Sequence, residues 1–291
     1  MIYPKITIVT PSFNQGKYLE DTLLSVINQK YPNLEYIVID GGSTDNSIEI
    51  IKKYEPQLTY WISETDKGLY DAIQKGFERS TGDIMAWINS DDMYHQKSLL
   101  TVAEIFEVFP KVNWLMGQNT FYNEFGQAFI MDDDTYHERW SKWRMYNFEG
   151  KFIQQESVFW RRELWEKAGG YIDKKINLAG DFDLWLRFFR YENLYSTTFL
   201  LSGFRFRNEN QKSNNNFKEY ISQTQKLLLR ENQIKNHSVY VVFCKLIILI
   251  SKAIIIKKYR NMLIHKVLKF PSKIIYLPRQ GYFLRKLYHL S

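Results

Sequence analysis

The chain has little with which to form covalent crosslinks. Cys244 is the only cysteine among 291 residues, so no intrachain disulfide can form and a reducing compartment is expected. Residues 1–5 lead directly into an apolar, β-rich segment and lack the charged and apolar regions of a signal peptide. These two absences favour a cytoplasmic protein.

Several common nucleotide-site and catalytic motifs are also absent. The first expected strand, residues 6–10, is not followed by Gly-x-Gly-x-x-Gly, which argues against a dinucleotide site. The chain has no Gly-Lys-Ser/Thr, which argues against a P-loop. No Ser-His or Cys-His pair suggests a covalent nucleophile. Any enzymatic chemistry therefore has to come from other side chains.

Acidic residues are missing from the C-terminal part. Residues 232–291 contain 12 Lys and Arg and no Asp or Glu, whereas residues 1–231 contain 27 basic and 32 acidic residues. The overall charge of +7 thus divides into −5 and +12. This asymmetry predicts an acidic globular part with a basic tail.

Apolar, β-rich segments alternate with segments of helical periodicity through the first 90 residues. This order is typical of a parallel sheet with right-handed helical crossovers, an α/β fold. Strands are expected at residues 6–10, 36–39, 58–62 and 84–88, and helices at 18–27, 47–54 and 70–77.

Carboxylates follow two of these strands. Asp40 comes after the second, and Asp91 and Asp92 come after the fourth. Open α/β sheets bind ligands at the carboxyl edge of the strands, and hard carboxylate oxygens suit Mg²⁺ or Mn²⁺. Alternatively, each turn is a solvated loop whose Asp caps the next helix, but two such turns at one edge are harder to explain in that way.

Several ordered motifs resemble one family. Residues 9–14, 39–45 and 89–92 are similar to successive signatures of family 2 glycosyltransferases, which have the GT-A fold, a Rossmann-like and mostly parallel sheet flanked by helices. Residues 63–72 resemble a segment typical of members that build bacterial surface polysaccharides, and residues 155–162 and 180–187 resemble the acceptor side.

The resemblance predicts how the chain is divided. A catalytic domain is expected at 1–231, with a nucleotide-sugar half at about 1–118 and an acceptor half at about 119–231. A basic, helical extension is expected at 232–291.

The resemblance implies inverting, metal-dependent transfer of a sugar from a nucleotide-sugar donor, expected to carry uridine diphosphate, to a saccharide or lipid-linked saccharide. Pro11 and Phe13 match positions that line the base, Asp40 matches the carboxylate that accepts from the base, and Lys67 matches a basic position near the nucleotide. Asp91 and Asp92 match the pair that contacts the ribose and holds Mg²⁺ or Mn²⁺. Asn89 stands where the family has Asp, which leaves open which of the two binds the metal.

The candidate general base is Asp181. It precedes an apolar segment, so it should lie at a helix N-terminus, which is expected to lower its pKa. Alternatively, Asp181 only caps that helix. Asp183 lies four residues before Arg187, the spacing of a helical ion pair, so we expect it to be structural. The family often has a histidine where Arg207 stands, so phosphate contacts by Arg205 or Arg207 are a weaker prediction.

The tail suggests contact with a membrane. Residues 239–256 are apolar but short for a spanning helix, and Ser238, Lys245 and Lys252 recur every seven residues as a polar stripe. We expect residues 239–286 to bind an anionic membrane surface, on the inner face of the plasma membrane. The rival interpretation is a helix packed on the catalytic domain, and a true span ranks last.

Three other functions compete with glycosyl transfer. A nucleotide-sugar nucleotidyltransferase should carry a Gly-rich basic loop after the first strand, where Pro11 and Phe13 stand instead. A degenerate relative that binds nucleotide or polysaccharide without turnover would not need its acidic residues intact. A nucleic-acid binder is suggested only by the basic tail, because no nucleic-acid motif is present, so no nucleic acid is expected as a partner.

Overall fold

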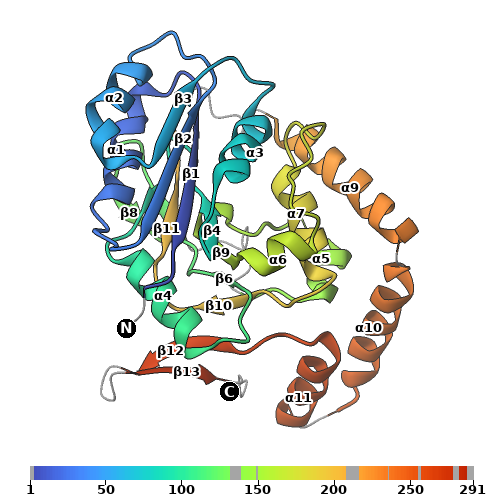
Figure 1. The fold of residues 1–291 in the computed structure, drawn as a ribbon. Helices are drawn as coiled ribbons and strands as arrows, with labels where there is room; N and C mark the ends of the chain where they lie inside the picture. Colours follow the sequence, from blue (N-terminus) through green and yellow to red (C-terminus); the bar gives the residue numbers. More distant parts are fainter. Residues whose placement is uncertain are drawn as a thin grey trace.

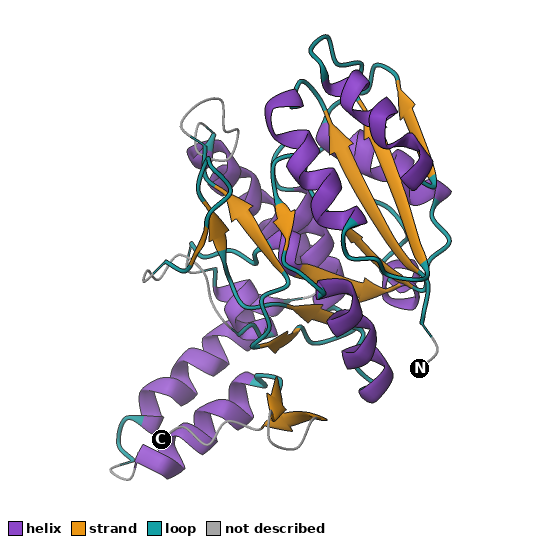
Figure 2. Cartoon of the chain, turned by 90° about the vertical axis from the view of Figure 1, so that its left-hand side faces the viewer, coloured by secondary structure: helices purple, strands orange, loops and turns teal. Residues whose placement is uncertain are grey.

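The protein is built around one large twisted sheet (Figure 1). The computed structural model describes residues 3–131, 139–148, 150–207, 216–234, 236–254, 257–277 and 282–286. Over these residues the sheet has nine strands in the order β13-β12-β10-β6-β9-β4-β1-β2-β3. Helices cover both of its faces, which confirms the predicted α/β fold (Figures 1 and 2).

The N-terminal half forms the parallel part of the sheet. β1 pairs in parallel with both β2 and β4, and β2 pairs in parallel with β3. Because β1 and β2 are in register from Ile6 to Ser12, Ser12 lies beside Asp40 at the carboxyl edge. The elements are β1 Ile6–Ser12, α1 Gly16–Ile27, β2 Leu34–Asp40, α2 Ser47–Tyr54, β3 Tyr60–Ser63, α3 Leu69–Arg79 and β4 Ile84–Trp87.

The second half reverses the direction of the sheet. β9 runs antiparallel between β4 and β6, and β10 then continues in parallel beside β6. The helix α7 follows β9 in the chain and packs back on the sheet. The elements are α4 Ser98–Val108, β6 Trp114–Met116, α5 Lys142–Asn147, β9 Val158–Arg161, α6 Arg162–Lys167, α7 Gly180–Phe189 and β10 Tyr195–Thr197.

A smaller sheet lies beside the end of β4. Its order is β5-β11-β7-β8, so a strand from residue 93 is paired with one from residue 202. This pairing brings the segment that follows β11 next to the turn that follows β4. The strands are β5 Met93–Tyr94, β7 Phe121–Tyr122, β8 Ala128–Phe129 and β11 Ser202–Arg205.

An aromatic cluster joins the two halves. Trp87 of β4 stacks on Trp185 of α7 with ring centroids 5.9 Å apart and nearly parallel planes, and Trp160 of β9 lies 5.7 Å from Trp87. All three rings are almost fully buried. Aromatic burial of this kind is a large part of a domain's core stabilisation. It fixes α7 against β4, and therefore Asp181 relative to the turn that carries Asp91.

The C-terminal part is both helical and β-stranded. The helix α9 packs on α7, while α10 and α11 lie side by side next to α5 (Figures 1 and 2). The boundary expected between residues 231 and 232 falls inside α9. The helices were expected, but β12 and β13, which extend the large sheet beyond β10, were not. The elements are α9 Phe217–Ile234, α10 His237–Ser251, α11 Lys257–Leu268, β12 Lys273–Leu277 and β13 Tyr282–Lys286.

Candidate active site

The turn after β2 is held by Asp40, which is fully buried. Its Oδ2 accepts from the backbone N–H of Gly42 (3.1 Å), the N–H of Ser43 (2.9 Å) and the hydroxyl of Ser63 (2.7 Å). Its Oδ1 accepts from the hydroxyl of Ser43 at 2.5 Å. Four donors match the four acceptor sites of a carboxylate, so Asp40 stabilises the turn. Its expected contact with a nucleotide base stays a prediction.

The loop after β1 is bound to that same turn. The hydroxyl of Ser43 accepts from the N–H of Asn14 (2.8 Å), and the side chain of Asn14 accepts from the N–H of Thr44 (2.8 Å). Gly42 has a φ of +82°, a left-handed conformation that favours glycine. Pro11 is buried inside β1, whereas Phe13 in this loop is 56% exposed. The structure thus presents the Phe13 ring at the edge of the sheet and keeps Pro11 in its wall.

The two carboxylates after β4 have different surroundings. Asp92 is buried: its Oδ1 accepts from the N–H of Arg205 at 2.9 Å, and its Oδ2 accepts from the side-chain amide of Asn89 at 3.2 Å. Asp91 is more exposed, and its Oδ2 lies 2.9 Å from Nη2 of Arg207. Asp92 therefore holds the turn, and Asp91 is the carboxylate that is open to a ligand.

Arg207 bridges the loops after β1 and β4. Besides its ion pair with Asp91, it donates from Nη1 to the side chain of Gln15 at 2.8 Å, and its guanidinium lies over the ring of Tyr18. Because it replaces the histidine common in the family, this contact was not predictable from the motif. It places a permanent positive charge next to Asp91.

Glu156 is a buried acid to which the sequence analysis assigned no role. It lies in the short 3₁₀ turn Gln155–Ser157 just before β9, and its Oε1 has no hydrogen-bond partner among the described residues. Burial, together with the charges of Asp91 and Asp181, raises the pKa of Glu156 to about 7. The sequence signal for Glu156 was its place in residues 155–162, the segment that resembles the acceptor side of the family, just before the apolar residues 158–160.

The pKa values of the two aspartates after β4 are also raised. Burial and the charges of Asp91 and Glu156 raise the pKa of Asp92 well above its usual range. Burial also raises the pKa of Asp91, although Arg207 and Arg205 act in the opposite direction. Crowded carboxylates raise each other's pKa values because like charges disfavour ionisation. A cation bound here would favour the ionised forms of these acids.

Asp181 lies in the first turn of α7, beside two tyrosines. The hydroxyl of Tyr70 donates to its Oδ1 at 3.3 Å, and the hydroxyl of Tyr220 lies 3.4 Å from its Oδ2. Gly180 permits this approach, because a Cβ at that position would lie 2.9 Å from the ring of Tyr70. The N-cap of α7 is Ala179, so Asp181 is not the cap, the alternative raised from the sequence.

The predicted direction of the Asp181 pKa was wrong. The helix N-terminus was expected to lower it, but burial raises the pKa of Asp181 to about 6. Hydrogen bonds from Phe182, Tyr70 and Tyr220 act in the lowering direction and are outweighed. At neutral pH the group is still mostly ionised, and a pKa nearer 7 makes it a stronger base than an ordinary aspartate.

Asp183 has the predicted structural contact. It accepts from Nε of Arg187 at 3.0 Å, and both side chains are almost fully buried. Arg230 of α9 also donates to it. With both of its oxygens occupied by guanidinium groups, Asp183 is not a candidate base.

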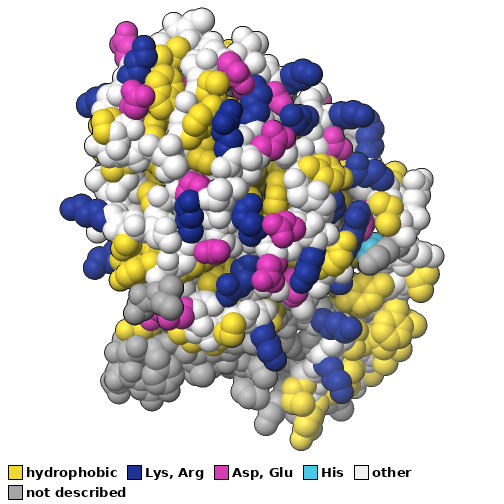
Figure 3. All heavy atoms as spheres, viewed as in Figure 1, with side chains coloured by type: hydrophobic (Ala, Val, Ile, Leu, Met, Phe, Trp, Pro, Cys, Tyr) yellow, Lys and Arg dark blue, Asp and Glu magenta, His cyan; other side chains and the backbone are white. Residues whose placement is uncertain are grey.

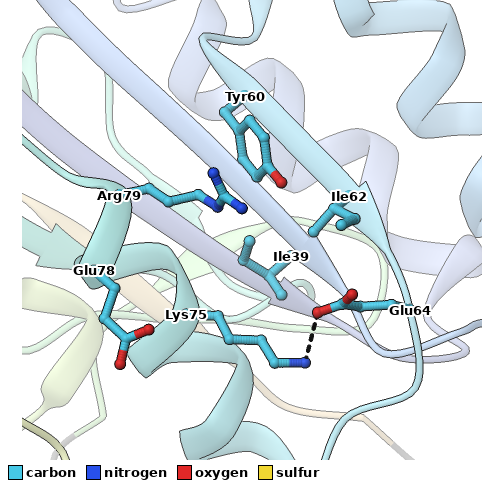
Figure 4. Close-up of a pocket in the computed structure, with 7 residues that line it drawn as sticks. All are labelled: Ile39, Tyr60, Ile62, Glu64, Lys75, Glu78 and Arg79. Atoms are coloured by element: carbon cyan, nitrogen blue, oxygen red, sulfur yellow. Dashed lines mark ion pairs between the residues drawn. The ribbon is translucent and has the colours of Figure 1, made fainter.

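Two hollows mark the surface near the parallel strands. One lies between β3 and α3 and is crossed by the Lys75–Glu64 ion pair (2.8 Å), with Tyr60 and Arg79 along its walls (Figure 4). None of the predicted site residues lines it. The other is lined by Lys67, Tyr70 and Lys174, among others. Because Tyr70 also donates to Asp181, the second hollow lies close to the first turn of α7.

A divalent cation fits the donor atoms of this site. Among the described residues, no three Asp, Glu, His or Cys side chains are grouped to hold a metal ion by themselves. Mg²⁺ and Mn²⁺ commonly take one or two protein carboxylates and complete their coordination with substrate phosphates and water. Asp91 can supply that carboxylate oxygen because it is the more exposed of the two, whereas Asp92 is buried and each of its oxygens accepts a hydrogen bond.

Comparison with known proteins identifies the family. Residues 7–160, more than half of the chain, match the family described as Glycosyl transferase family 2. The protein belongs to glycosyltransferase family 2. A Bacillus subtilis relative named for teichuronic acid biosynthesis, TuaG, is 34% identical over 99 residues, which are 33% of this chain and 39% of the relative. The chain spans about two fifths of the length of this and other curated relatives of similar identity.

Solved structures show the GT-A-like fold. Residues 1–349 of TarS from S. aureus, in complex with UDP-GlcNAc, superpose with a TM-score of 0.61 at 17% identity, covering 78% of this chain and 66% of that one. The mannosyltransferase PcManGT from Pyrobaculum calidifontis, in complex with GDP-Man and Mn²⁺, gives a TM-score of 0.57 at 16% identity, covering 81% and 66%. At these identities the likeness establishes the fold alone.

Proposed function

We propose that the family 2 glycosyltransferase described here moves a sugar from a nucleotide-sugar donor, a UDP-sugar, to a saccharide or lipid-linked saccharide, with inversion and with a divalent cation. One observation carries this proposal. Trp87 of β4 stacks on Trp185 of α7, so the turn that carries Asp91 and the first turn of α7, which carries Asp181, are packed together; burial and the charges of both aspartates raise the pKa of Glu156 between them. An acid that can hold a metal and an acid that can act as a base are thereby brought to one place.

The donor side follows from the loops after β1 and β2. Phe13 presents an exposed aromatic ring, and the Asp40 turn keeps the adjoining backbone fixed. Lys67, on the loop before α3, is exposed at the neighbouring hollow and can contact a phosphate or ribose. The UDP-GlcNAc complex of TarS, which shares the fold, supports a uridine nucleotide.

Asp91 would hold the metal. A bound Mg²⁺ or Mn²⁺ neutralises the charge that develops on the leaving diphosphate. The GDP-Man and Mn²⁺ complex of PcManGT supports this use of a cation in the fold. Arg207, already in contact with Asp91, adds a fixed positive charge near the same position. Asp92 acts indirectly, by positioning the turn and the backbone of Arg205.

Asp181 is the proposed general base. It takes the proton from the acceptor hydroxyl while that oxygen bonds to the anomeric carbon of the donor sugar. The bond from that carbon to the diphosphate oxygen breaks in the same step, and the nucleoside diphosphate leaves with the bonding pair. One displacement inverts the anomeric centre and needs no covalent nucleophile. The tyrosines at 70 and 220 orient the carboxylate.

A donor screen tests the proposal. The protein is incubated with Mn²⁺ and a panel of UDP-, GDP- and dTDP-sugars, and hydrolysis or transfer is followed by mass spectrometry. We expect turnover of a UDP-sugar that Asp181→Asn abolishes and Glu166→Gln, a change at an exposed acid on α6, leaves intact. Tight nucleotide binding without turnover of any donor, with or without added saccharide acceptors, would instead identify a binding protein.

The biological setting is proposed to be surface-polysaccharide synthesis. TuaG, which is 34% identical over the aligned region, is named for teichuronic acid biosynthesis. Residues 63–72 and the position of Lys67 fit the same group of enzymes. The donor sugar and the linkage are to be read from the product of the screen.

A further inference from the structure

The helix α10 has an inner face that is packed against the protein. Cys244 and Ser251 are fully buried on this face. Cys244 belongs to a small apolar cluster with Trp143 of α5 and Leu268 of α11. The packed-helix interpretation raised from the sequence thus describes one face of α10, and the other face needs its own explanation.

The outer face of α10 is apolar and exposed. Six side chains on it are between 52% and 65% exposed. At 100° per residue they fall within an arc of about 120°, opposite Cys244 and Ser251. Soluble proteins seldom expose so many neighbouring large apolar groups without a partner. The six are Val239, Val242, Phe243, Leu246, Leu249 and Ile250.

Figure 3 shows this apolar surface at the lower right, over α10, with Lys and Arg side chains beside it. Lys245 and Lys252 are exposed and follow one edge of the arc. On the neighbouring helix α11, Tyr259 and Met262 are more than half exposed and Lys266 is exposed. No acidic residue occurs after Glu231. An apolar stripe with lysines along one edge is complementary to lipid tails beneath anionic headgroups.

We propose that the outer face of α10 docks into the interfacial region of an anionic bilayer, with Lys245 and Lys252 at the headgroups. A second copy of the chain is a poorer occupant, because it would oppose two segments that each have 12 basic and no acidic residues. No single described helix has both the length and the hydropathy to span a bilayer; α9 and α10 reach them only together, across a bend of 101°. The helix therefore lies along the surface.

Vesicle flotation of the full chain tests this docking. We expect the protein to float with vesicles of phosphatidylglycerol and phosphatidylcholine at low salt, and to remain at the bottom with phosphatidylcholine alone. High salt should lower the floated fraction about tenfold, because headgroup attraction is screened. Binding to both vesicles alike, or to neither, would overturn the proposal.

Variants locate the docking face. Phe243→Ser, Leu246→Ser and Leu249→Ser combined should remove flotation, whereas Phe125→Ser, a change at an 85% exposed side chain in the turn between β7 and β8, should not. Unchanged circular dichroism and nucleotide binding show that the triple variant is folded. Flotation that survives the triple variant contradicts the assignment to α10.

Two double variants with the same change in charge distinguish the role of the lysines at this edge of α10 from that of the protein's net charge. Lys245→Glu with Lys252→Glu should lower binding about tenfold or more, whereas Lys111→Glu with Lys167→Glu, two exposed lysines elsewhere, should lower it far less. Equal losses would point to net charge and contradict the docking geometry.

Two further outcomes would each contradict the proposal. If the chain sediments as a dimer, the triple variant as a monomer, and neither floats, the face binds a second copy and the lipid proposal is wrong. If the floated protein resists alkaline carbonate, it is integral and the surface placement is wrong. None of these outcomes depends on glycosyltransferase activity.

Discussion

The carboxyl ends of β2 and β4 each place aspartate at the same edge of the sheet, but the two turns differ. At the end of β2, Asp40 accepts four hydrogen bonds from Gly42, Ser43 and Ser63. At the end of β4, Asp91 and Asp92 lie near Glu156, and the pKa values of all three are raised. The carboxylate of the β2 turn is fully hydrogen-bonded, whereas burial and mutual repulsion disfavour ionisation of the carboxylates at the β4 turn.

This difference indicates different roles for two turns that look equivalent in the sequence. A saturated carboxylate rigidifies a loop before any ligand arrives, and such preorganisation reduces the entropy that binding costs. Crowded carboxylates instead favour whatever brings positive charge to them. We infer that the β2 turn shapes the nucleotide site and the β4 turn recruits the cation. The predictions that follow would break or sharpen this division.

The largest effect is expected at Asp181, outside both turns. Asp181→Asn should lower transfer about 1,000-fold, within the range of general-base catalysis, and leave nucleotide affinity unchanged in calorimetry. Because the pKa of Asp181 is raised only to about 6, the rate of the wild-type protein should fall as pH drops below 6, where the base becomes protonated. A rate loss in Asp183→Asn without one in Asp181→Asn would reassign the base.

The next effect distinguishes the two β4 carboxylates. Asp91→Asn should lower transfer about 100-fold, as does removing one charge-stabilising group elsewhere, and abolish the response to Mn²⁺. Asp92→Asn should lose much less, since an amide oxygen can still accept from the N–H of Arg205. Rates measured over a Mn²⁺ series compare them. Equal losses and equal Mn²⁺ responses would mean that both carboxylates hold the ion.

Removing the β2 carboxylate should mainly reduce stability. Asp40→Ala leaves one buried and one partly buried backbone N–H group of the turn without their acceptor, so we expect a loss of about 2–3 kcal/mol in the free energy of unfolding. Denaturant unfolding measures this change, and Glu166→Ala, at an exposed acid on α6, serves as the control. A stable Asp40→Ala protein with weakened nucleotide binding would show that Asp40 contacts the base directly.

The smallest effect is expected at Glu156, where a substitution should increase the free energy of unfolding. Its pKa is raised to about 7 in the folded protein, so folding favours the protonated form. The stabilisation from that proton is complete below the unfolded pKa, near pH 4, and is lost as pH rises through 7.

Glu156→Gln should therefore raise the free energy of unfolding by about 1–2 kcal/mol at pH 6 relative to its effect at pH 4. Urea unfolding with chelator present, at both pH values, measures the difference. A variant whose stability relative to the wild-type protein does not change between pH 4 and pH 6 would contradict the raised pKa of Glu156.

Much of the β2 and β4 comparison was visible in the sequence, because apolar runs that end in aspartate locate strand ends. The ion pair of Asp183 with Arg187 also followed from helical spacing. What could not be predicted depends on contacts between distant segments. Arg207 meets Asp91 only because β11 pairs with β5, and the charge conflict at Glu156 exists only in the folded site.

Two predictions, the pKa of Asp181 and the environment of α10, were wrong or incomplete for physical reasons. For Asp181, the favourable effect of the helix N-terminus could be read from the sequence, but the larger effect of burial could not. For α10, the heptad of Ser238, Lys245 and Lys252 marked one edge of the exposed face. Periodicity could not reveal that the side of Cys244 packs on α5 and α11.

The most direct test is a calorimetric titration of UDP with and without Mn²⁺, on the wild-type protein, Asp91→Asn and Asp40→Asn. In the wild-type protein Mn²⁺ should raise UDP affinity about tenfold or more, since Asp91 would hold an ion that neutralises the charge of the diphosphate. Asp40→Asn should bind more weakly yet keep the Mn²⁺ effect, and Asp91→Asn should lose that effect. If Mn²⁺ raises the UDP affinity of Asp91→Asn as much as that of the wild-type protein, the β4 turn does not recruit the cation and the central claim is contradicted.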